Sequence, residues 1–328
     1  MKQDNRTDQD WLAAAAALGQ RARPLSRPNP AVGAIVVRDG RVVGRGWTRA
    51  GGRPHAEAEA LAMAGEAARG ATLYVTLEPC AHASERGPAC ADLAVAAGLR
   101  HVVVAVEDPD RRTAGAGMAR IAAAAIAAEL VSSPAAEASL EGYLARRTLG
   151  RPHVTLKLAL SLDGCIALAS GESRWITGEE ARAHAHLERG RVDAILVGGG
   201  TLRADGPRLD VRLPGLEGRS PERWVLTRGE PPEGWRKLAS PADISAMTEV
   251  QYLLVEGGAQ TAAAFLAADL VDRLLIYRAP VVIGGRPGIG DIGLTDLASA
   301  HGRWREADSR RLGNDRLDVY ERTRCLPE

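Results

Sequence analysis

Residues 55–90 read HAEAEALAMAGEAARGATLYVTLEPCAHASERGPAC, and this stretch carries the most informative pattern of the chain. His55 opens the stretch, Cys80 follows an apolar run that is predicted to be a strand, and Cys90 closes it. One imidazole and two thiolates form the ligand set of a catalytic zinc ion that keeps its fourth position open for water. We therefore predict that these three residues bind zinc.

Glu57 follows the first ligand by two residues. It is too close to His55 to be a comfortable fourth ligand, and it is well placed to move protons for a water molecule at the metal. The order His-x-Glu, Pro-Cys and Cys is typical of zinc enzymes that deaminate nucleobases. His82 is an alternative ligand. It lies in the predicted loop between the cysteines, whereas Cys90 is predicted to open a helix, whose N-terminus favours a thiolate.

Strands and helices alternate through the first half of the chain, which favours a three-layer α/β domain. The pair Asp39-Gly40 predicts a hairpin turn, and Asp10 is the predicted N-cap of the first helix. The expected strands are 31–37, 41–47, 71–77 and 101–106, and the expected helices are 10–21, 55–68, 91–97 and 116–129.

The pattern is interrupted near residues 145–152, where arginines, a glycine and a proline cluster. We therefore predict one domain over residues 1–148 and a second over residues 149–328. In the second, Thr177 to Glu180 resembles a capping box, and the proline-rich, charged stretch 227–250 is expected to be a loop. The expected strands there are 153–160, 193–197, 224–226, 252–255, 274–277 and 317–320, and the expected helices are 177–189 and 259–268.

The composition indicates a cytoplasmic globular protein. The 328 residues, 45% of them apolar and 25% charged, suffice for two domains. A formal charge of +1 and an aromatic content of 4% speak against a broad nucleic-acid-binding surface. The four cysteines are unevenly spread and do not resemble a disulfide framework. No stretch approaches the roughly 18 apolar residues of a membrane span, so we expect no membrane partner.

Two glycine-rich turns follow predicted strands in the second half, at Gly198–Thr201 and Glu256–Gly258. Unobstructed backbone N–H groups at a helix start form an anion site suited to a dinucleotide pyrophosphate, although ordinary turns would look the same in sequence. Arg189 and Arg212 could hold a substrate phosphate with forked hydrogen bonds. The stretch Gly288–Gly293 also fits G-x-G-x-x-G, but a proline-containing loop precedes it, so we expect no dinucleotide site there.

The first half resembles the deaminase half of the bifunctional riboflavin-biosynthesis deaminase/reductases. The resemblance is carried by Pro28–Gly33 (PNPAVG), His55–Glu57 (HAE), Thr76–His82 (TLEPCAH), Asp108-Pro109 and Ala114–Gly117. It implies a cytidine-deaminase-like three-layer α/β fold and a zinc cofactor. The implied substrate is a diaminopyrimidinone ribosylamino 5′-phosphate that loses the amino group at ring C2. The likeness also implies that Asn29 and His82 line the pyrimidine pocket, with Arg86 as the basic contact.

The second half resembles the reductase half of the same family, which implies a dihydrofolate-reductase-like α/β domain that uses NADPH to open the ribose to a ribityl chain. The resemblance is carried by Lys157–Gly164 (KLALSLDG), Gly171–Gly178 (GESRWITG), Gly200-Thr201 with Asp205 and Pro207, Val255–Gly258 (VEGG), and Asp272, Tyr277 and Ala279-Pro280. The implied NADPH contacts are Ala159, Trp175, Thr201, Asp205, Thr227, Gly258, Ala259, Gln260, Thr261, Ala262, Ala263 and Ala264. The implied substrate contacts are Ser173, Arg189, Leu209, Arg212 and Glu256.

The sequence thus predicts a bifunctional enzyme for a small pyrimidine ribosyl phosphate, with no nucleic-acid partner; the family likeness implies a homo-oligomer. Two alternatives stay open. One is an active deaminase with a degenerate reductase domain, because Cys165 and Gly206 stand where the family has a basic and an acidic residue, and the segment 227–250 is short. The other is an RNA-binding protein with a deaminase fold, which would need a basic surface and base-stacking aromatics.

Overall fold

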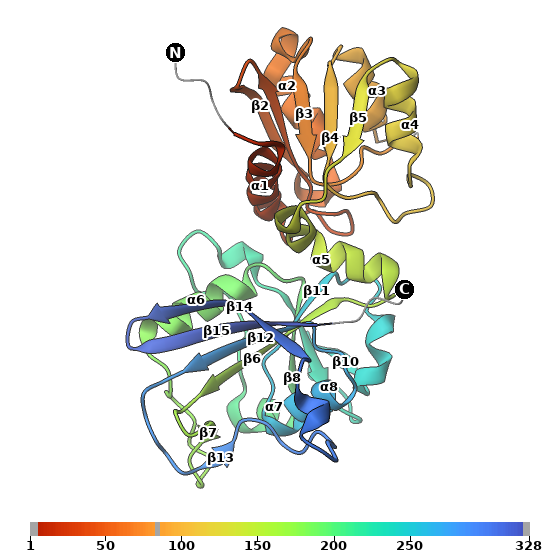
Figure 1. Ribbon diagram of the computed structural model, residues 1–328. Coiled ribbons are helices and arrows are strands. Elements are labelled where there is room, and N and C mark those ends of the chain that lie inside the picture. The colour runs from red at the N-terminus through yellow and green to blue at the C-terminus, as the bar shows by residue number, and fades with distance from the viewer. Residues whose placement is uncertain (1–5, 83–85, 324–328) are drawn as a thin grey trace. The chain divides into compact units, whose positions relative to one another are not determined.

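The computed structural model describes residues 6–82 and 86–323 of the chain. Cys325 and the loop residues 83–85 lie outside these ranges. The chain divides into two compact units, unit 1 (Met1–Gly150) and unit 2 (Arg151–Glu328), and each is built on its own main sheet (Figure 1). Each unit also has its own buried apolar residues. None of the helices within the described residues is long and apolar enough to cross a membrane.

Unit 1 is built on a five-stranded sheet of order β2-β1-β3-β4-β5. β1 pairs antiparallel with both β2 and β3, whereas β3, β4 and β5 run parallel. The predicted hairpin between the first two strands is present, with positive φ at both Asp39 and Gly40, as such a tight turn requires. The strands are β1 (Gly33–Arg38), β2 (Arg41–Trp47), β3 (Thr72–Val75), β4 (His101–Val104) and β5 (Ala127–Leu130).

Helices cover both faces of this sheet, which makes the three layers that the sequence predicts. Because side chains alternate along a strand, the side chains on each face of the sheet pack into a separate apolar core. Val36 and Leu73 pack with the helices of one face, and Ile35 and Tyr74 pack against Trp11 on the other. The helices are α1 (Asp8–Gly19), α2 (Ala56–Ala64), α3 (Cys90–Ala96), α4 (Ala116–Ala123) and α5 (Pro134–Thr148).

Two expectations for unit 1 were wrong, and one helix was missed. Thr7, not Asp10, is the N-cap of α1, and Asp10 is instead the third helical residue of a capping box. The helix expected over 116–129 ends at Ala123, and the alanine-rich residues that follow form β5 because they pair in parallel with β4. α5 was not expected, although Pro134 at its first position after Ser133 is a common helix-start signal.

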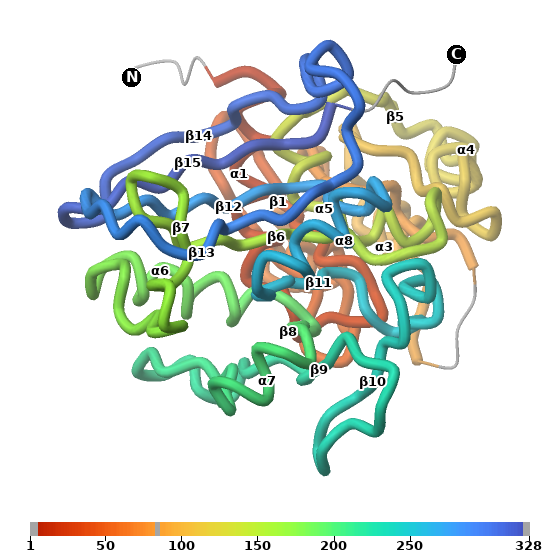
Figure 2. The backbone as a smooth tube through the Cα atoms, turned by 90° about the horizontal axis from the view of Figure 1, so that it is seen from below, coloured from red at the N-terminus to blue at the C-terminus, as the bar shows by residue number. Residues whose placement is uncertain are grey.

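Unit 2 is built on an eight-stranded sheet of order β10-β9-β8-β11-β6-β12-β15-β14, which can be followed strand by strand in Figure 2. The first six strands of this order, β10 to β12, run parallel. β15 pairs antiparallel with β12, and β14 pairs antiparallel with β15. The strands are β6 (His153–Leu160), β8 (Ala194–Gly198), β9 (Glu222–Leu226), β10 (Arg236–Leu238), β11 (Tyr252–Val255), β12 (Arg273–Arg278), β14 (Trp304–Leu312) and β15 (Asp315–Arg322), with β7 (Cys165–Ala167) and β13 (Arg286–Pro287) forming a small second sheet.

The helices of unit 2 begin directly after strands or glycines. They are α6 (Glu179–Arg189), α7 (Gly199–Asp205) and α8 (Ala259–Ala267). The capping box expected at Thr177 is absent: Gly178 is the N-cap of α6, and its backbone N–H donates to the Asp315 carboxylate at 2.6 Å instead. The core of this unit packs Phe265 of α8 against Leu253 and neighbouring strand residues.

Four strands of unit 2 were not expected. β14 carries charged side chains along most of its length, so it lacks an alternating apolar pattern, and β7, β10 and β13 are two or three residues long. The stretch 227–250, expected to be a loop, contains β10 and a short 3-10 turn, Pro241–Ala246. No helix opens within Gly288–Gly293, as the sequence predicts for this chance match.

Two candidate active sites

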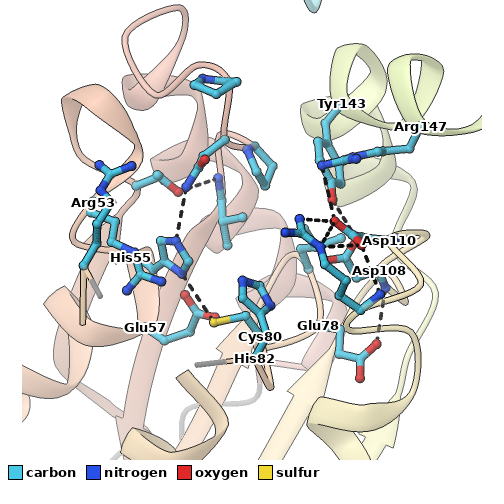
Figure 3. Close-up of a pocket in the computed structure, with 18 residues that line it drawn as sticks. Arg53, His55, Glu57, Glu78, Cys80, His82, Asp108, Asp110, Tyr143 and Arg147 are labelled. Carbon is cyan, nitrogen blue, oxygen red and sulfur yellow. Dashed lines mark hydrogen bonds and ion pairs between the residues drawn. The ribbon is translucent and has the colours of Figure 1, made fainter. Parts of the chain in front are cut away.

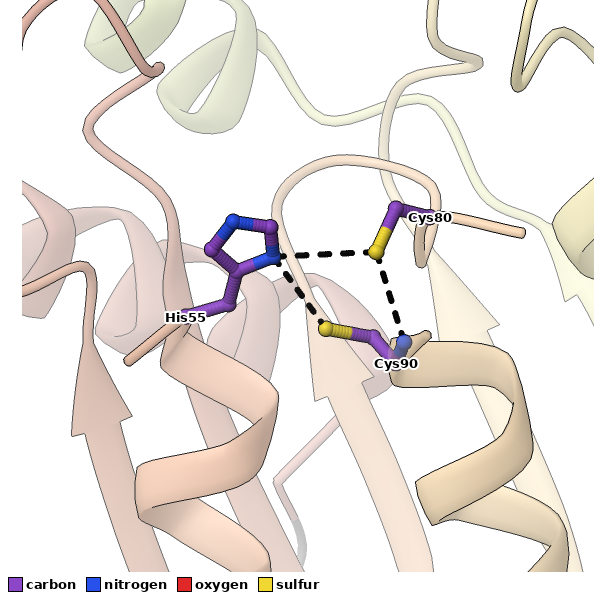
Figure 4. Close-up of side chains that lie close together, drawn as sticks. All are labelled: His55, Cys80 and Cys90. Carbon is purple, nitrogen blue, oxygen red and sulfur yellow. Dashed lines mark hydrogen bonds between the residues drawn. The ribbon is translucent and has the colours of Figure 1, made fainter. Parts of the chain in front are cut away.

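The predicted zinc ligands meet at the start of two helices. His55 is the N-cap of α2, Cys90 is the first residue of α3, and Cys80 lies in the loop after β3. The Nδ1 atom of His55 is 3.3 Å from Cys90 Sγ and 3.7 Å from Cys80 Sγ (Figure 4). All three ligand atoms lie within 4.8 Å of one another. The fold therefore brings together residues that are up to 35 positions apart in sequence.

These separations fit a tetrahedral zinc site. Zn–S bonds of about 2.3 Å and Zn–N bonds of about 2.1 Å place tetrahedral ligand atoms roughly 3.6 Å apart. The hydrogen bonds from Cys90 and His55 lower the pKa of Cys80, which favours at this sulfur the thiolate that metals bind. The same hydrogen bond, together with burial, raises the pKa of Cys90, so the pair favours one thiolate, at Cys80. The backbone N–H of Cys90 also donates to Cys80 Sγ, at 3.3 Å. The donor set and its spacing therefore match zinc.

Glu57 lies beside the ligands, in the first turn of α2, whose N-cap is His55. Only 3% of the residue is exposed, and burial raises the pKa of its carboxyl group. Glu57 and the ligands His55 and Cys80 line one cavity of about 200 Å³ (Figure 3). A buried carboxyl group with a raised pKa, next to a metal site and open to a cavity, is suited to accept and return a proton.

The residues that the family likeness implies for the pyrimidine pocket also line this cavity: Asn29, His82 and Arg86. The Asn29 amide donates to Gly52 O at 3.0 Å and lies 3.3 Å from His55 Nε2. Gly52 has φ +84°, and a Cβ there would lie 2.6 Å from the Asn29 side chain, so glycine is needed for this approach. His82 is outside the ligand cluster, so the structure favours Cys90 as the third zinc ligand.

Sequence reasoning missed the charged wall of this cavity. The Asp110 carboxylate accepts hydrogen bonds from Arg112 and forms an ion pair with Arg147 Nη2 at 3.3 Å. Tyr143 O–H donates to Asp108 at 2.7 Å. Asp108 stands in a segment that carries the resemblance, so its role could have been suspected. Arg147 and Tyr143 belong to α5, a helix that was not expected, so the sequence held no comparable signal for them.

Unit 2 has a cavity of about 800 Å³ that gathers many of the residues implied for the reductase. It lies where the parallel strands β6, β8 and β11 end, the usual place for ligands in such sheets. The predicted residues that line it are Ala159, Trp175, Thr201, Asp205 and Gly258 for NADPH, and Ser173, Arg189, Arg212 and Glu256 for substrate. Those outside the lining are Thr227, Leu209, Ala259, Gln260, Thr261, Ala262, Ala263 and Ala264.

The glycine-rich turns of unit 2 lie against each other. Gly198 and Gly258 are the N-caps of α7 and α8. A Cβ on Gly198 would lie 2.2 Å from Thr261 Oγ1, and one on Gly258 would lie 3.4 Å from Thr201 Oγ1. The first glycine therefore lets two helix N-termini approach closely, and backbone N–H groups of this kind suit the phosphates of a dinucleotide.

Charged residues that are largely buried form the floor of the same cavity. Arg189 donates to the Glu256 carboxylate through Nε at 2.7 Å and through Nη2 at 2.8 Å. The Nε and Nη2 atoms, which could form a forked pair of hydrogen bonds to a phosphate, are therefore already bonded to Glu256, contrary to the expectation from sequence. Burial acts to raise the pKa of Glu256, but the charge and hydrogen bonds of Arg189, with the charge of Lys157, outweigh it and hold the pKa at about 2. Burial lowers the pKa of Lys157, which also lines the cavity and which sequence reasoning missed.

Two family models match the chain. The model described as the cytidine and deoxycytidylate deaminase zinc-binding region matches residues 5–106, and the model described as the RibD C-terminal domain matches residues 152–234 and 242–317. Unit 1 thus has a cytidine-deaminase-like fold, and unit 2 has the dihydrofolate-reductase-like fold of RibD C-terminal domains.

Relatives match over nearly the full length. Riboflavin biosynthesis protein RibD of Aquifex aeolicus (strain VF5) is 33% identical over an alignment of 353 positions, gaps included, that covers 96% of this chain and 98% of that protein. The structure of Acinetobacter baumannii RibD, form 1, is 34% identical and covers 97% of this chain and 99% of its own, with a TM-score of 0.87.

A further similar structure is that of a diaminohydroxyphosphoribosylaminopyrimidine deaminase/5-amino-6-(5-phosphoribosylamino)uracil reductase from Thermotoga maritima. It is 29% identical and covers 96% of this chain and 99% of its own, with a TM-score of 0.87. Together with the His/Cys/Cys cluster and the two domain matches, these likenesses establish the family. The chain belongs to the RibD family: it is a bifunctional enzyme of riboflavin biosynthesis, with a zinc-dependent deaminase and an NADPH-dependent reductase.

Proposed function

We propose that the unit 1 cavity deaminates 2,5-diamino-6-ribosylamino-4(3H)-pyrimidinone 5′-phosphate, and that the unit 2 cavity then reduces the ribosyl group of the product to ribityl. The observation that carries the first step is the convergence of His55, Cys80 and Cys90 beside the buried Glu57 in one cavity. The two activities named for the Thermotoga maritima enzyme support the substrate and the order of the two steps.

In the first step, His55, Cys80 and Cys90 would hold zinc, which supplies a Lewis acid that activates water. Glu57 would take one proton from that water and deliver it to the ring nitrogen as the oxygen bonds to C2. It would then pass the proton of the new hydroxyl group to the amino group, so that the bond from C2 to this nitrogen breaks, ammonia leaves and the carbonyl forms. Asn29 and His82 line the same cavity and would orient the ring. Burial of the two cysteines and of Glu57 keeps bulk water away from the reacting carbon.

In the second step, NADPH would supply a hydride to C1′ of the ribose, while the bond between C1′ and the ring oxygen breaks and that oxygen takes a proton to become a hydroxyl of the ribityl chain. Trp175, Thr201, Asp205 and Gly258 line one part of the cavity and would hold the dinucleotide, whose phosphates suit the paired N-termini of α7 and α8. Arg212 is partly exposed at the cavity and would bind the substrate phosphate, since the fork of Arg189 is taken up by Glu256. The protein's task is mainly to position two reactants and exclude water.

A coupled assay with the diaminopyrimidinone phosphate tests both steps. Ammonia release without NADPH, and NADPH oxidation only after ammonia has been released, are the expected results. NADPH oxidation that precedes ammonia release would overturn the proposed order. Ammonia release with no NADPH oxidation at any time would instead favour a deaminase whose reductase domain is degenerate.

We also infer that the enzyme works as a homo-oligomer in the cytoplasm and binds no nucleic acid. The free thiols of Cys80, Cys90 and Cys165 among the described residues support a reducing compartment, and the formal charge of +1 speaks against a general affinity for RNA. Light scattering of the purified protein measures the oligomeric state. An RNA-binding titration at several salt concentrations tests the last point, and tight, salt-sensitive binding would contradict it.

A further inference from the structure

Glu78, two residues before the zinc ligand Cys80, holds a distant segment of unit 1 in place. Its carboxylate accepts hydrogen bonds from four backbone N–H groups. Oε1 accepts from Gly117 at 2.9 Å and Met118 at 3.1 Å, and Oε2 accepts from Gly115 at 3.0 Å and Asp108 at 3.3 Å. Only 3% of Glu78 is exposed, so water does not compete for these bonds.

Two of these donors are the N-terminal N–H groups of α4, which lacks a cap of its own. The N-cap of α4 is Gly115, which has no side chain to accept a hydrogen bond. Glu78 supplies the missing acceptor from another part of the chain, and its negative charge is favourable at the positive end of the helix dipole. Amides at the first helical positions that lose their acceptor inside a protein would be left without a partner, which is costly.

The start of α4 lies in close backbone contact with the loop that carries Cys80. A Cβ at Gly117 would lie 1.9 Å from the carbonyl oxygen of Pro79, the residue between Glu78 and Cys80. The metal loop and the start of α4 are therefore in direct backbone contact, and a residue larger than glycine would push them apart.

The segment held in this way carries the charged wall of the deaminase cavity. Residues 108–113 run between the two ends that Glu78 fixes, and Asp108, Asp110 and Arg112 line the cavity (Figure 3). The hydroxyl of Thr113 lies 3.5 Å from Nδ1 of His82, another lining residue. A shift of the segment would thus move side chains on the substrate side of the cavity while the three zinc ligands stay on their own elements.

We infer that Glu78 is a positioning residue for deamination, which sets the distance between the zinc ligands and the substrate-facing segment 108–113. Glu78 is outside the ligand cluster, and although it is among the residues that line the cavity, both of its carboxylate oxygens accept hydrogen bonds from backbone amides. It acts through the backbone amides that it accepts from, so its loss affects the binding of the pyrimidine phosphate more than the bond-making step. This inference rests on the proposed deaminase reaction.

The test is Glu78→Gln in the full-length zinc-loaded enzyme, because this change keeps the size of the side chain and removes its charge and part of its acceptor capacity. We expect KM for deamination to rise about tenfold with kcat changed by less than about threefold. Zinc content by elemental analysis should stay at the wild-type level, and the amides of Gly115, Gly117 and Met118 should exchange hydrogen faster. The matched control is Glu107→Gln, an exposed glutamate beside Asp108, which should keep the wild-type KM.

Gly117→Ala is a second, independent variant, which displaces α4 while Glu78 stays intact, and it should raise KM in the same way. A wild-type zinc content reports that unit 1 of each variant is folded, and reduction of the already deaminated intermediate, which reports on unit 2, should not change. An unchanged KM in both variants would overturn the inference. So would loss of zinc with a collapse of kcat, which would show that Glu78 supports the metal rather than the cavity wall. A wild-type enzyme that releases no ammonia would instead refute the deaminase reaction itself, while the hydrogen-exchange result would still report on Glu78.

Discussion

Arg189 and Glu256, 67 residues apart in sequence, are joined by two parallel hydrogen bonds on the floor of the reductase cavity. Both side chains are mostly buried, with 13% and 9% exposed. Pairing of this kind satisfies the carboxylate and the fork of the guanidinium at once, so neither charge is left alone inside the protein. Two arginines that look alike in sequence therefore have different roles. Arg189 is bonded to Glu256 on the cavity floor, whereas the more exposed Arg212 can bind an anion.

Arg189→Ala and Arg212→Ala should therefore behave differently. Removing Arg189 leaves the buried Glu256 carboxylate without its hydrogen bonds and with only Lys157 Nζ, 3.9 Å away, as a counter-charge. This loss costs up to about 3–5 kcal/mol and should lower the melting temperature by roughly 10 °C. Removing Arg212, whose side chain is 52% exposed, should leave the melting temperature unchanged and raise the reductase KM for substrate about tenfold. Thermal melts and steady-state kinetics measure the two effects, with ammonia release as the control. Equal effects of either variant on both activities would contradict the assignment.

The same ion pair predicts that the folding stability of unit 2 falls at low pH. The pKa of Glu256 falls from 4.5 to about 2 on folding, so the unfolded chain takes up the proton first as the pH drops. The stabilisation, roughly 3 kcal/mol at most, is present above pH 4.5 and is lost as the pH falls toward 2. Hydrogen exchange of the β11 amides between pH 5 and pH 2.5 measures this loss in unit 2 alone. In Glu256→Gln the slope over this range should be smaller, and an identical slope would refute the prediction.

Glu57→Gln should abolish deamination and spare reduction. The amide cannot accept and return a proton, so ammonia release should fall by a factor of about 10²–10⁴. Zinc content should be unchanged, because Glu57 is not a ligand. NADPH oxidation with the already deaminated intermediate measures the second activity in the same preparation. If both activities were lost, the two halves of the enzyme would not be independent.

Removing zinc should have the same selective effect. Treatment with a chelator should stop ammonia release and leave NADPH oxidation of the deaminated intermediate intact, and added zinc should restore the first activity. Elemental analysis of the untreated protein should find one zinc ion per chain. Cys80→Ser and Cys90→Ser should lower that content, whereas Cys165→Ala, at a buried cysteine of unit 2, serves as the matched control and should not. Zinc content that does not depend on Cys80 or Cys90 would exclude the proposed ligand set.

Trp175 should be a contact for NADPH. It lines the reductase cavity and is 65% exposed, with the guanidinium of Arg182 4.8 Å from its ring centre. A large ring left open at a cavity is suited to stack on a flat ligand, and Trp175→Ala should raise KM for NADPH about tenfold. The control is Leu297→Ala, which removes another exposed apolar side chain outside the cavity lining. An unchanged KM for NADPH would mean that Trp175 does not meet the cofactor.

The elements that sequence reasoning found and missed differ in one physical respect. The residues of α2 and α6 favour a helix by themselves, so both helices were predicted, with bounds that differ by a few residues from those in the structure. β5 and β14 form because a neighbouring strand offers them hydrogen-bonding partners. An alanine-rich or charged stretch contains no pattern from which this pairing could be predicted.

From the sequence alone we could predict the proposed zinc ligands and the proposed acid–base residue, because His55, Glu57, Cys80 and Cys90 occupy short local motifs at the starts of helices and after a strand. Which charged side chains face each cavity could not be predicted from the sequence and follows from the tertiary structure. Arg147 reaches Asp110 from a helix that was not expected, Glu78 reaches α4, and Arg189 reaches Glu256. These pairs depend on how elements far apart in the chain pack together, and a side chain's partner is set by that packing and not by its neighbours in sequence.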